Sequence, residues 1–187
     1  MNRCCIPLFF ICVITLCSCG QTKNKRWNEK TEAIVEKWSG EKMPLPDSMY
    51  IISFGTLDQY DITQKGNTLK VATFVDGSCS ACMVNLAFWK DFMIKIYKER
   101  KDCRFYFFID LPEYNTQENT NPLLEVGFEC PWILDLGHSY FQKNEIYDPR
   151  LQTVLLNKND EVILIGDPTL NEGLAQLYYD VICNYEN

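Results

Sequence analysis

Histidine is almost absent from this sequence of 187 residues, and positive charge is in short supply. His138 is the only histidine, and 18 lysines and arginines stand against 25 aspartates and glutamates, which gives a net charge of −7. A surface that binds nucleic acid needs clustered positive charge to neutralise phosphates. The composition therefore argues against nucleic acid as a partner.

Several other features are missing from the chain. It contains no glycine-rich fingerprint of a nucleotide or flavin site, no internal repeat and no second long hydrophobic run after the one at its start. Hydrophobic residues nevertheless make up 47% of the chain and aromatic residues 13%, which is ample for a packed core. We therefore expect one globular domain that holds no cofactor.

The first 18 residues are typical of a secretory signal. Arg3 provides a positive charge, and an apolar run extends from Cys4 to Cys17. The run is too short for a membrane-spanning helix, which needs about 20 apolar residues. We expect residues 1–18 to be cleaved, residues 19–46 to form a tether with a short helix, and residues 47–187 to form the domain. An ordinary signal cut nearby, or an uncleaved anchor, is the alternative.

The end of this segment, Leu16-Cys17-Ser18-Cys19, resembles the bacterial lipobox. The resemblance implies that Cys19 receives lipid and becomes the mature N-terminus. Several acyl chains on one residue would anchor the protein stably to a membrane. By the same analogy, the protein would be a lipoprotein of the cell envelope with its domain facing the periplasm.

Cysteine is the informative residue type, with 10 copies in the chain. Removal of the signal and lipidation of Cys19 would leave five, and an exported protein lies where disulfides persist. Because five is odd, at least one thiol is free or pairs outside the domain. The five are Cys79, Cys82, Cys103, Cys130 and Cys183.

The order of the expected elements indicates an α/β domain. Residues 69–75 and 105–109 are predicted buried strands, separated by a helix over 80–101. The apolar positions that fall near one stripe of this helix are Val84, Ala87, Phe88, Phe92, Ile96 and Tyr97. Two β-rich runs, 151–156 and 162–165, predict a hairpin before a final helix over 170–185. The inward positions expected for that helix are Leu174, Leu177, Tyr178, Val181 and Ile182. Alternating strands and helices imply a parallel section, to which the hairpin adds an antiparallel edge.

Cys79-Ser80-Ala81-Cys82 lies where the first buried strand passes into the long helix. Two cysteines at this spacing can exchange with disulfides, bind a metal or form a static disulfide. Zinc needs about four ligands, and the chain has no second such pair. At a helix start, unpaired backbone N–H groups stabilise a thiolate. This context favours redox exchange, with Cys79 as nucleophile and Cys82, one turn later, as the resolving thiol.

The strand, the cysteine turn and the Lys158–Val162 hairpin resemble the thioredoxin superfamily. The chain is most similar to its lipid-anchored bacterial branch, related to periplasmic thiol–disulfide oxidoreductases, over residues 47–185. The resemblance implies a thioredoxin-like α/β fold: a central mixed sheet with a C-terminal β-hairpin and helices on both faces. It also implies substrates among disulfides of exported proteins, or a partner redox domain, with Gln152 and Thr153 binding the substrate backbone.

Three positions depart from the family pattern. Gln152 occupies the position of a cis-proline, and we expect the peptide bond there to be trans. Thr73 replaces a buried acid, and Ser78 replaces an aromatic residue before the first cysteine. The departures keep a second hypothesis open, in which the fold serves as a redox-inactive binding or structural module of the envelope.

The remaining polar and sulfur-bearing candidates have ordinary explanations. His138, beside Gly137, is a candidate general base, but a lone histidine in a loop is more often polar surface, and we interpret it so. Cys103, Cys130 and Cys183 are interpreted as small, buried or half-buried hydrophobic residues.

Overall fold

The computed structural model describes residues 29–46, 48–53, 56–61, 68–112 and 122–186. The expected signal, residues 1–18, and the expected lipidation site, Cys19, lie outside the described residues. Contacts divide the chain into two units, Met1–Glu36 and Lys37–Asn187. A helix covers residues 29–38, where the sequence predicts one, and the account below concerns the second unit.

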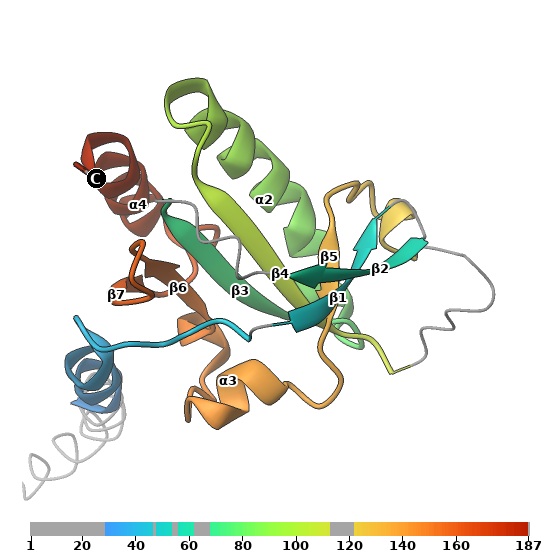
Figure 1. The fold of residues 1–187 in the computed structure, drawn as a ribbon, viewed down its shortest axis with the longest axis horizontal. Coiled ribbons are helices and arrows are strands. Elements are labelled where there is room, and N and C mark those ends of the chain that lie inside the picture. Colours follow the sequence, from blue (N-terminus) through green and yellow to red (C-terminus); the bar gives the residue numbers. More distant parts are fainter. Residues whose placement is uncertain (1–28, 47, 54–55, 62–67, 113–121, 187) are drawn as a thin grey trace, which may run out of the picture. The chain divides into compact units, whose positions relative to one another are not determined.

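A mixed sheet of seven strands, counted over the described residues, forms the centre of the second unit (Figure 1). Its spatial order is β2-β1-β5-β4-β3-β6-β7. The pairs β3–β4 and β4–β5 are parallel, and all other neighbouring pairs are antiparallel. The strands are β1 (Ser48–Ser53), β2 (Thr56–Asp61), β3 (Lys70–Asp76), β4 (Arg104–Asp110), β5 (Trp132–Leu134), β6 (Thr153–Leu156) and β7 (Val162–Ile165).

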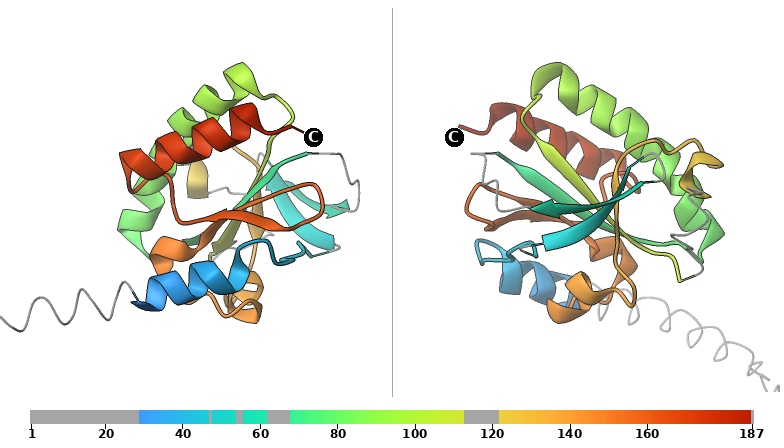
Figure 2. Two further views of the ribbon diagram at one scale, coloured as in Figure 1. Left: turned by 90° about the vertical axis from the view of Figure 1, so that its left-hand side faces the viewer. Right: turned by 45° about the vertical axis from the view of Figure 1, so that its right-hand side comes forward.

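Helices cover both faces of this sheet. The helices α2 (Ser80–Glu99) and α4 (Glu172–Asn184) lie together on one face, and the short α3 (Ser139–Lys143) lies on the other (Figures 1 and 2). Two 3-10 turns, Pro122–Leu124 and Pro149–Leu151, interrupt the loops. Within the described residues, none of the helices combines the length and the apolar character that crossing a bilayer requires.

Aromatic packing holds α2 against the sheet. Trp89 is 1% exposed, and its ring meets that of Phe107 edge to face, with centroids 5.5 Å apart. Phe92 contacts Tyr178 of α4 in the same way at 6.4 Å. Such aromatic pairs add about 0.5–1.5 kcal/mol each beyond the area they bury. They therefore fix the start of α2 relative to the ends of β3 and β4.

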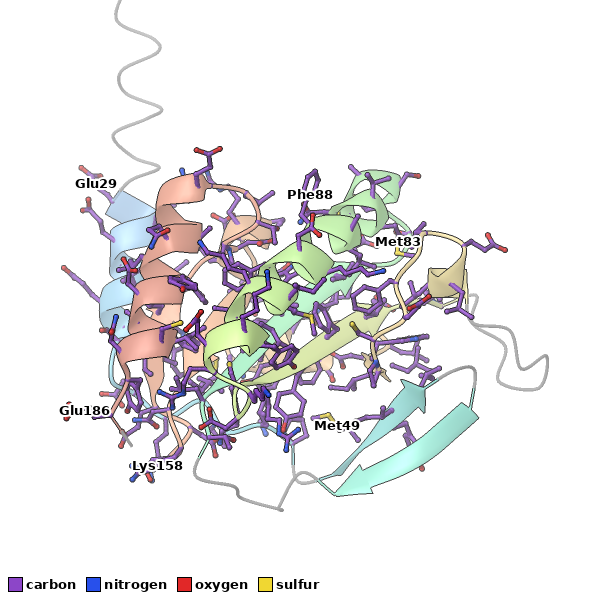
Figure 3. The ribbon with its side chains drawn as sticks, turned by 90° about the horizontal axis from the view of Figure 1, so that it is seen from above. Glu29, Met49, Met83, Phe88, Lys158 and Glu186 are labelled. Atoms are coloured by element: carbon purple, nitrogen blue, oxygen red, sulfur yellow. A yellow bond between two sulfur atoms is a disulfide. The ribbon has the colours of Figure 1, made fainter. Side chains whose placement is uncertain are left out.

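The predicted inward face of α2 was right in part, since Phe92 and Ile96 are buried as predicted. Val84 and Phe88 are 62% and 58% exposed, and Figure 3 shows Phe88 on the outer side of the helix. The other buried positions are Leu86, Trp89 and Met93. Apolar residues occur around most of this helix, so the sequence pattern selects no single stripe. The bulk of Trp89 against the sheet decides the orientation.

The final helix follows the prediction more closely. Tyr178 and Ile182 are completely buried, as predicted. Leu177, also expected to face inward, is 46% exposed, because it stands one position away from Tyr178 on the outer side. Asn171 caps the helix, its side-chain oxygen accepting a hydrogen bond from the Leu174 backbone N–H at 3.0 Å.

The hairpin of β6 and β7 has a covered outer edge. The backbone N–H of Gly40 donates to the carbonyl of Val162 at 2.9 Å, and the N–H of Val162 donates to Glu41 at 3.0 Å. A third bond joins the Met43 N–H to the carbonyl of Asp160 at 2.8 Å. Because an open strand edge invites pairing with other chains, this segment protects the hairpin.

Candidate redox site

The site begins at the carboxyl ends of the two central parallel strands. Asp76 ends β3 and lies in register with Asp110, which ends β4. A carboxylate oxygen of Asp76 accepts hydrogen bonds from the N–H and the hydroxyl of Ser78, at 2.9 and 2.6 Å. Short side chains that bond the backbone two residues on are typical turn formers. The turn redirects the chain from β3 into α2.

Glycine is required at position 77. Its N–H donates to the carbonyl of Asp110 at 2.8 Å, so the turn runs directly alongside the end of β4. A Cβ at this position would lie 2.6 Å from that carbonyl oxygen and 2.7 Å from a methyl group of Leu111. Any side chain here would push the turn, and with it the cysteine pair, away from β4.

Cys79 is the N-cap of α2. Its sulfur accepts a hydrogen bond from the backbone N–H of Cys82 at 3.2 Å, which is the position that a capping side chain takes. The two cysteines form a disulfide, with Cα atoms 5.2 Å apart, and both are half-buried. The predicted geometry is present: two sulfurs on the first turn of a helix, with neither sealed in the core.

A cleft of about 480 Å³ opens over the disulfide. We call it the redox cleft. Four separate parts of the chain line it: the end of β3, the start of α2, the loop before α3, and the segments on either side of the β6–β7 hairpin. Its polar lining includes Asp76, Asn85, His138, Gln152 and Asp167. The cysteine pair therefore faces a space that can admit part of another molecule.

Apolar side chains surround the mouth of this cleft. Tyr147 and Leu170 line it and are 67% and 59% exposed. Ala81, between the cysteines, is exposed and also lines the cleft. Exposed apolar groups around a reactive centre suit contact with another polypeptide chain.

Gln152 and Thr153, the predicted substrate-binding residues, lie in different surroundings. Gln152 lines the redox cleft but is 8% exposed, and its side-chain nitrogen donates to the carbonyl of Ile146 at 3.2 Å. Its own carbonyl accepts from the N–H of Phe74 at 2.9 Å. Thr153 is 1% exposed, and its carbonyl accepts from Gly166 at 2.8 Å. It is absent from the cleft lining. No cis peptide bond occurs among the described residues, and the bond at Gln152 is trans, as expected.

Thr73 is buried beneath the site. Its hydroxyl and that of Thr153 share a hydrogen bond of 2.7 Å across the β3–β6 pair. A threonine hydroxyl does not take up a proton near neutral pH, so this position offers no acid or base to the cysteines. The departure from the family pattern at position 73 is thus real in the folded chain.

The structure places His138, the candidate general base that we interpreted as polar surface, in the wall of the redox cleft. The side chain is 31% exposed, lines the redox cleft, and lies with its ring centroid 4.1 Å from that of Phe74. Its Nε2 lies 2.8 Å from a carboxylate oxygen of Asp110. Asp110 itself had a sequence signal, because the carboxyl ends of neighbouring parallel strands meet at one edge of a sheet. His138 had none, since only the folded loop carries it there.

The three other cysteines of the domain are free thiols. Burial, aided by the nearby charge of Asp102, raises the pKa of the Cys103 thiol to about 12. Burial also raises the pKa of Cys130 and of Cys183. Such thiols are poor nucleophiles, which leaves the Cys79–Cys82 pair as the candidate for reactive sulfur in this unit. Among the residues that the structure describes, no three His, Cys, Asp or Glu side chains gather closely enough to hold a metal ion.

Comparison with known proteins places the fold. No protein-family model and no curated protein matches the chain. Solved structures do match, at low identity. A candidate protein disulfide isomerase from Bacteroides thetaiotaomicron is 15% identical, with a TM-score of 0.56, covering 77% of this chain and 89% of that one.

Two further structures are similar to the same extent. A candidate thiol:disulfide interchange protein DsbE from Chlorobium tepidum is 16% identical, with a TM-score of 0.56, covering 77% of this chain and 97% of that one. The thioredoxin domain of a thiol–disulfide oxidoreductase from Bacteroides vulgatus is 9% identical, with a TM-score of 0.57, covering 77% and 97%. These matches confirm the predicted thioredoxin-like α/β fold, and at such identities they establish the fold alone.

Proposed function

We propose that this protein is a thiol–disulfide oxidoreductase that acts through Cys79 and Cys82. The observation that carries the proposal is the position of Cys79 at the N-cap of α2, with its sulfur bound by the N–H of Cys82 and facing an open cleft. A helix N-terminus stabilises negative charge on a group placed there. Reduction of the pair would therefore leave Cys79 as the favoured thiolate.

The exchange reaction runs in two steps. The Cys79 thiolate attacks one sulfur of a substrate disulfide, forms a mixed disulfide and releases the other substrate sulfur as a thiolate. Cys82 then loses its proton and attacks the Cys79 sulfur, which releases the second substrate thiolate. The products are the Cys79–Cys82 disulfide and a reduced substrate. With a reduced substrate and an oxidised pair, the same steps run in reverse.

The substrates in this proposal are disulfides or dithiols of exported proteins, or a partner redox domain. Support comes from the exposed apolar side chains at the mouth of the redox cleft, Tyr147 and Leu170, which suit contact with a polypeptide. Gln152, in the cleft wall, would hold the substrate backbone, and Thr153 would support it from within the sheet. Several structural neighbours carry names from thiol–disulfide exchange, which agrees with this substrate class.

The location is the second part of the proposal. Residues 1–18 would direct export, and lipid on Cys19 would tether the protein to a membrane of the cell envelope, with the domain facing the periplasm. The support is the N-terminal sequence: one positive charge, a short apolar run, and Leu16-Cys17-Ser18-Cys19. Mass spectrometry of the protein isolated from membranes tests this: the expected N-terminal peptide begins with acylated Cys19, and an unmodified Cys19 would contradict the anchor.

The redox proposal is tested by insulin reduction in the presence of dithiothreitol. The full-length protein in detergent is compared with its Cys79→Ser and Cys82→Ser variants, and with Cys103→Ala as the matched control. We expect the wild type and Cys103→Ala to accelerate reduction equally, and Cys79→Ser to lower the rate to the background. Cys82→Ser should accumulate a mixed disulfide with a substrate peptide, because its first step is intact.

The rival function, a redox-inactive binding module, makes the opposite prediction. The Cys79–Cys82 disulfide would then act as a static brace and resist reduction until the domain unfolds. Equilibration with glutathione buffers of graded potential, followed by acid trapping and mass spectrometry, separates the two. Reversible reduction with unchanged circular dichroism supports the oxidoreductase, and reduction that occurs only with unfolding overturns it.

A further inference from the structure

We propose that His138 and Asp110 form a proton relay for the cysteine pair, in which His138 takes the proton from the Cys82 thiol and Asp110 holds the histidine in place. The inference rests on the proposed function and adds a residue pair to it. It also accounts for how the site works with Thr73 where a buried acid would be expected. Three observations support it. His138 and Asp110 are in contact, His138 lines the redox cleft, and position 73 holds a threonine, which is not a base.

The histidine is held in a defined place. His138 follows Gly137 and adopts a left-handed backbone conformation, with φ of 56°, just before α3. Its ring lies against that of Phe74 from β3, at 4.1 Å between centroids and 32° between planes. A non-glycine residue at positive φ is uncommon and marks a position fixed by its surroundings. The Phe74 side chain of β3 therefore packs against one side of the imidazole ring.

Asp110 fixes the orientation of the ring. One of its oxygens lies 2.8 Å from His138 Nε2, and its side chain is 12% exposed. The other oxygen is buried and has no hydrogen-bond partner among the described residues. A carboxylate paired with one ring nitrogen fixes which nitrogen carries the proton and stabilises the imidazolium that forms. With Nε2 bonded to Asp110, the opposite nitrogen, Nδ1, is the one available to a thiol.

The histidine opens onto the same space as the sulfurs, and Asp110 supports it from below. His138, Cys79 and Cys82 all line the redox cleft, and Asp110 pairs with Asp76 at the end of the strands directly beneath the turn. Thr73, by contrast, is 2% exposed and bonded to Thr153. The structure thus places a titratable base on the cleft side of the cysteines, and a neutral hydroxyl on the sheet side.

The proton balance of the step is simple. While Cys79 is bound to substrate, neutral His138 accepts the proton of the Cys82 thiol as the Cys82 sulfur attacks the Cys79 sulfur. The Cys79–substrate bond breaks, and its electron pair leaves on the substrate sulfur. His138, now an imidazolium beside the Asp110 carboxylate, passes its proton to that sulfur. Two electrons reach the substrate, the cysteine pair is oxidised, and the histidine returns to its neutral form.

Other charged groups face this space and could titrate with it. Asp167, across the cleft, is the main competitor as a base, because burial raises the pKa of its carboxyl above the ordinary value. Its carboxylate already accepts hydrogen bonds from the N–H and hydroxyl of Thr169, at 2.8 and 2.6 Å. The remaining titratable groups around the histidine are Asp76 from β3, Asp135 at the base of its own loop, and Tyr147 from the far wall.

The test is the rate at which the mixed disulfide resolves. Full-length protein in detergent is fully reduced and mixed in stopped flow with a fluorescent peptide disulfide, from pH 5 to pH 9. Wild type is compared with His138→Gln, Asp110→Asn and Asp167→Asn. Gln can keep the contact with Asp110 but cannot titrate. Formation of the mixed disulfide by Cys79 is read from the first phase, and resolution by Cys82 from the second.

We expect His138→Gln to slow the second phase about 10²-fold at pH 7, which is the usual size of a general-base contribution. The first phase should be unchanged. The loss should shrink toward pH 9, because a free thiol, with a pKa of about 8.5, then ionises without help. Asp110→Asn should give a smaller loss, because the imidazole then loses the carboxylate that holds its Nε2 in place.

Rescue separates a chemical role from a structural one. In His138→Ala, added imidazole should restore the second phase, and a merely structural histidine would not be replaced in this way. The relay is overturned if the second phase and its pH profile are the same in wild type and His138→Gln, or if Asp167→Asn alone changes them. Failure of wild type to form the mixed disulfide at all would instead contradict the proposed oxidoreductase function.

Discussion

Cysteines near the two ends of α2 lie in opposite environments. At the N-terminal end, Cys79 caps the helix and its sulfur receives a backbone N–H, at the mouth of an open cleft. Just beyond the C-terminal end, Cys103 is 1% exposed, and burial raises the pKa of its thiol to about 12. Cys183, from α4, contacts the same region, and the pKa of its thiol is also raised. One helix therefore separates the sulfur that we propose as the nucleophile from sulfurs that act as small hydrophobic groups.

The difference comes from backbone polarity and burial acting in the same direction. Unpaired N–H groups at a helix start favour an anion, whereas unpaired carbonyls at the other end disfavour it. At the C-terminal end, the backbone N–H of Arg100 donates to the carbonyl of Ile96 at 2.8 Å, and the Arg100 side chain forms an ion pair with Asp102. The expected reactivity of each cysteine thiol therefore depends on its position relative to the ends of α2 and on its burial.

The prediction with the largest expected effect is a difference in reactivity between the thiols of Cys79 and Cys103. We expect iodoacetamide at pH 7 to modify Cys79 of the mildly reduced protein at least about 10²-fold faster than Cys103, since only the thiolate reacts. Peptide mapping by mass spectrometry reads each cysteine separately. Comparable rates for Cys79 and Cys103 in the folded protein would remove the distinction between the ends of α2.

The second prediction concerns the stability of the C-terminal end at alkaline pH. Folded Cys103 keeps its proton up to a pKa of about 12, whereas the unfolded chain releases it near 9.0. A raised folded pKa gives stability that is complete below the unfolded value and is lost as pH rises. The free energy of unfolding should therefore fall from about pH 9 to 12, by up to about 1.4 kcal/mol per pH unit from this thiol.

Urea denaturation across this pH range measures that slope. Cys103→Ala is the comparison, because it removes the titrating group and should flatten the curve between pH 9 and 12 whatever its effect at neutral pH. Tyr97, whose pKa burial raises to about 12, will keep part of the slope above pH 10. Parallel curves for wild type and Cys103→Ala would mean that the Cys103 thiol has the same pKa in the folded and the unfolded chain, which contradicts the prediction.

The third prediction concerns how the N-terminal end is built. Gly77→Ala would bring a Cβ to 2.6 Å from the Asp110 carbonyl, so the turn before Cys79 must move. We expect a loss of about 1–3 kcal/mol in the free energy of unfolding, the usual cost of forcing atoms into filled space. Ser80→Ala, at the exposed first residue of α2, should stay within about 0.5 kcal/mol. Equal stability of the two variants would contradict the close approach of the turn to β4.

Much of the fold was readable from the sequence, because its signals are local. The β-branched run over 69–75 and the aromatic run over 105–109 appear as β3 and β4, and the hairpin lies where two β-rich runs flank a polar turn. The cysteine pair appears at the helix start, as its place between strand and helix indicates. The face of α2 was predicted only in part, at Phe92 and Ile96, since apolar residues surround the helix and packing of Trp89 selects the side.

The site was readable only in part, because half of it is brought together from distant loops. Gln152 was found through the family resemblance, and it lines the cleft. His138 was named only as a candidate base, since a lone histidine in a loop carries no pattern, and its pairing with Asp110 depends on the path of the chain between β5 and α3. Asp167 and Tyr147 reach the cleft for the same long-range reason.

The central claim is that the first turn of α2 holds the Cys79 sulfur as an anion. The direct measurement is the alkylation rate of Cys79 in the full-length Cys82→Ser variant, followed from pH 4 to pH 10 by peptide mapping, with an unstructured cysteine peptide as reference. The rate should reach half of its maximum at least about one pH unit below the reference, which titrates near 8.5. A midpoint at or above that of the peptide would contradict the account.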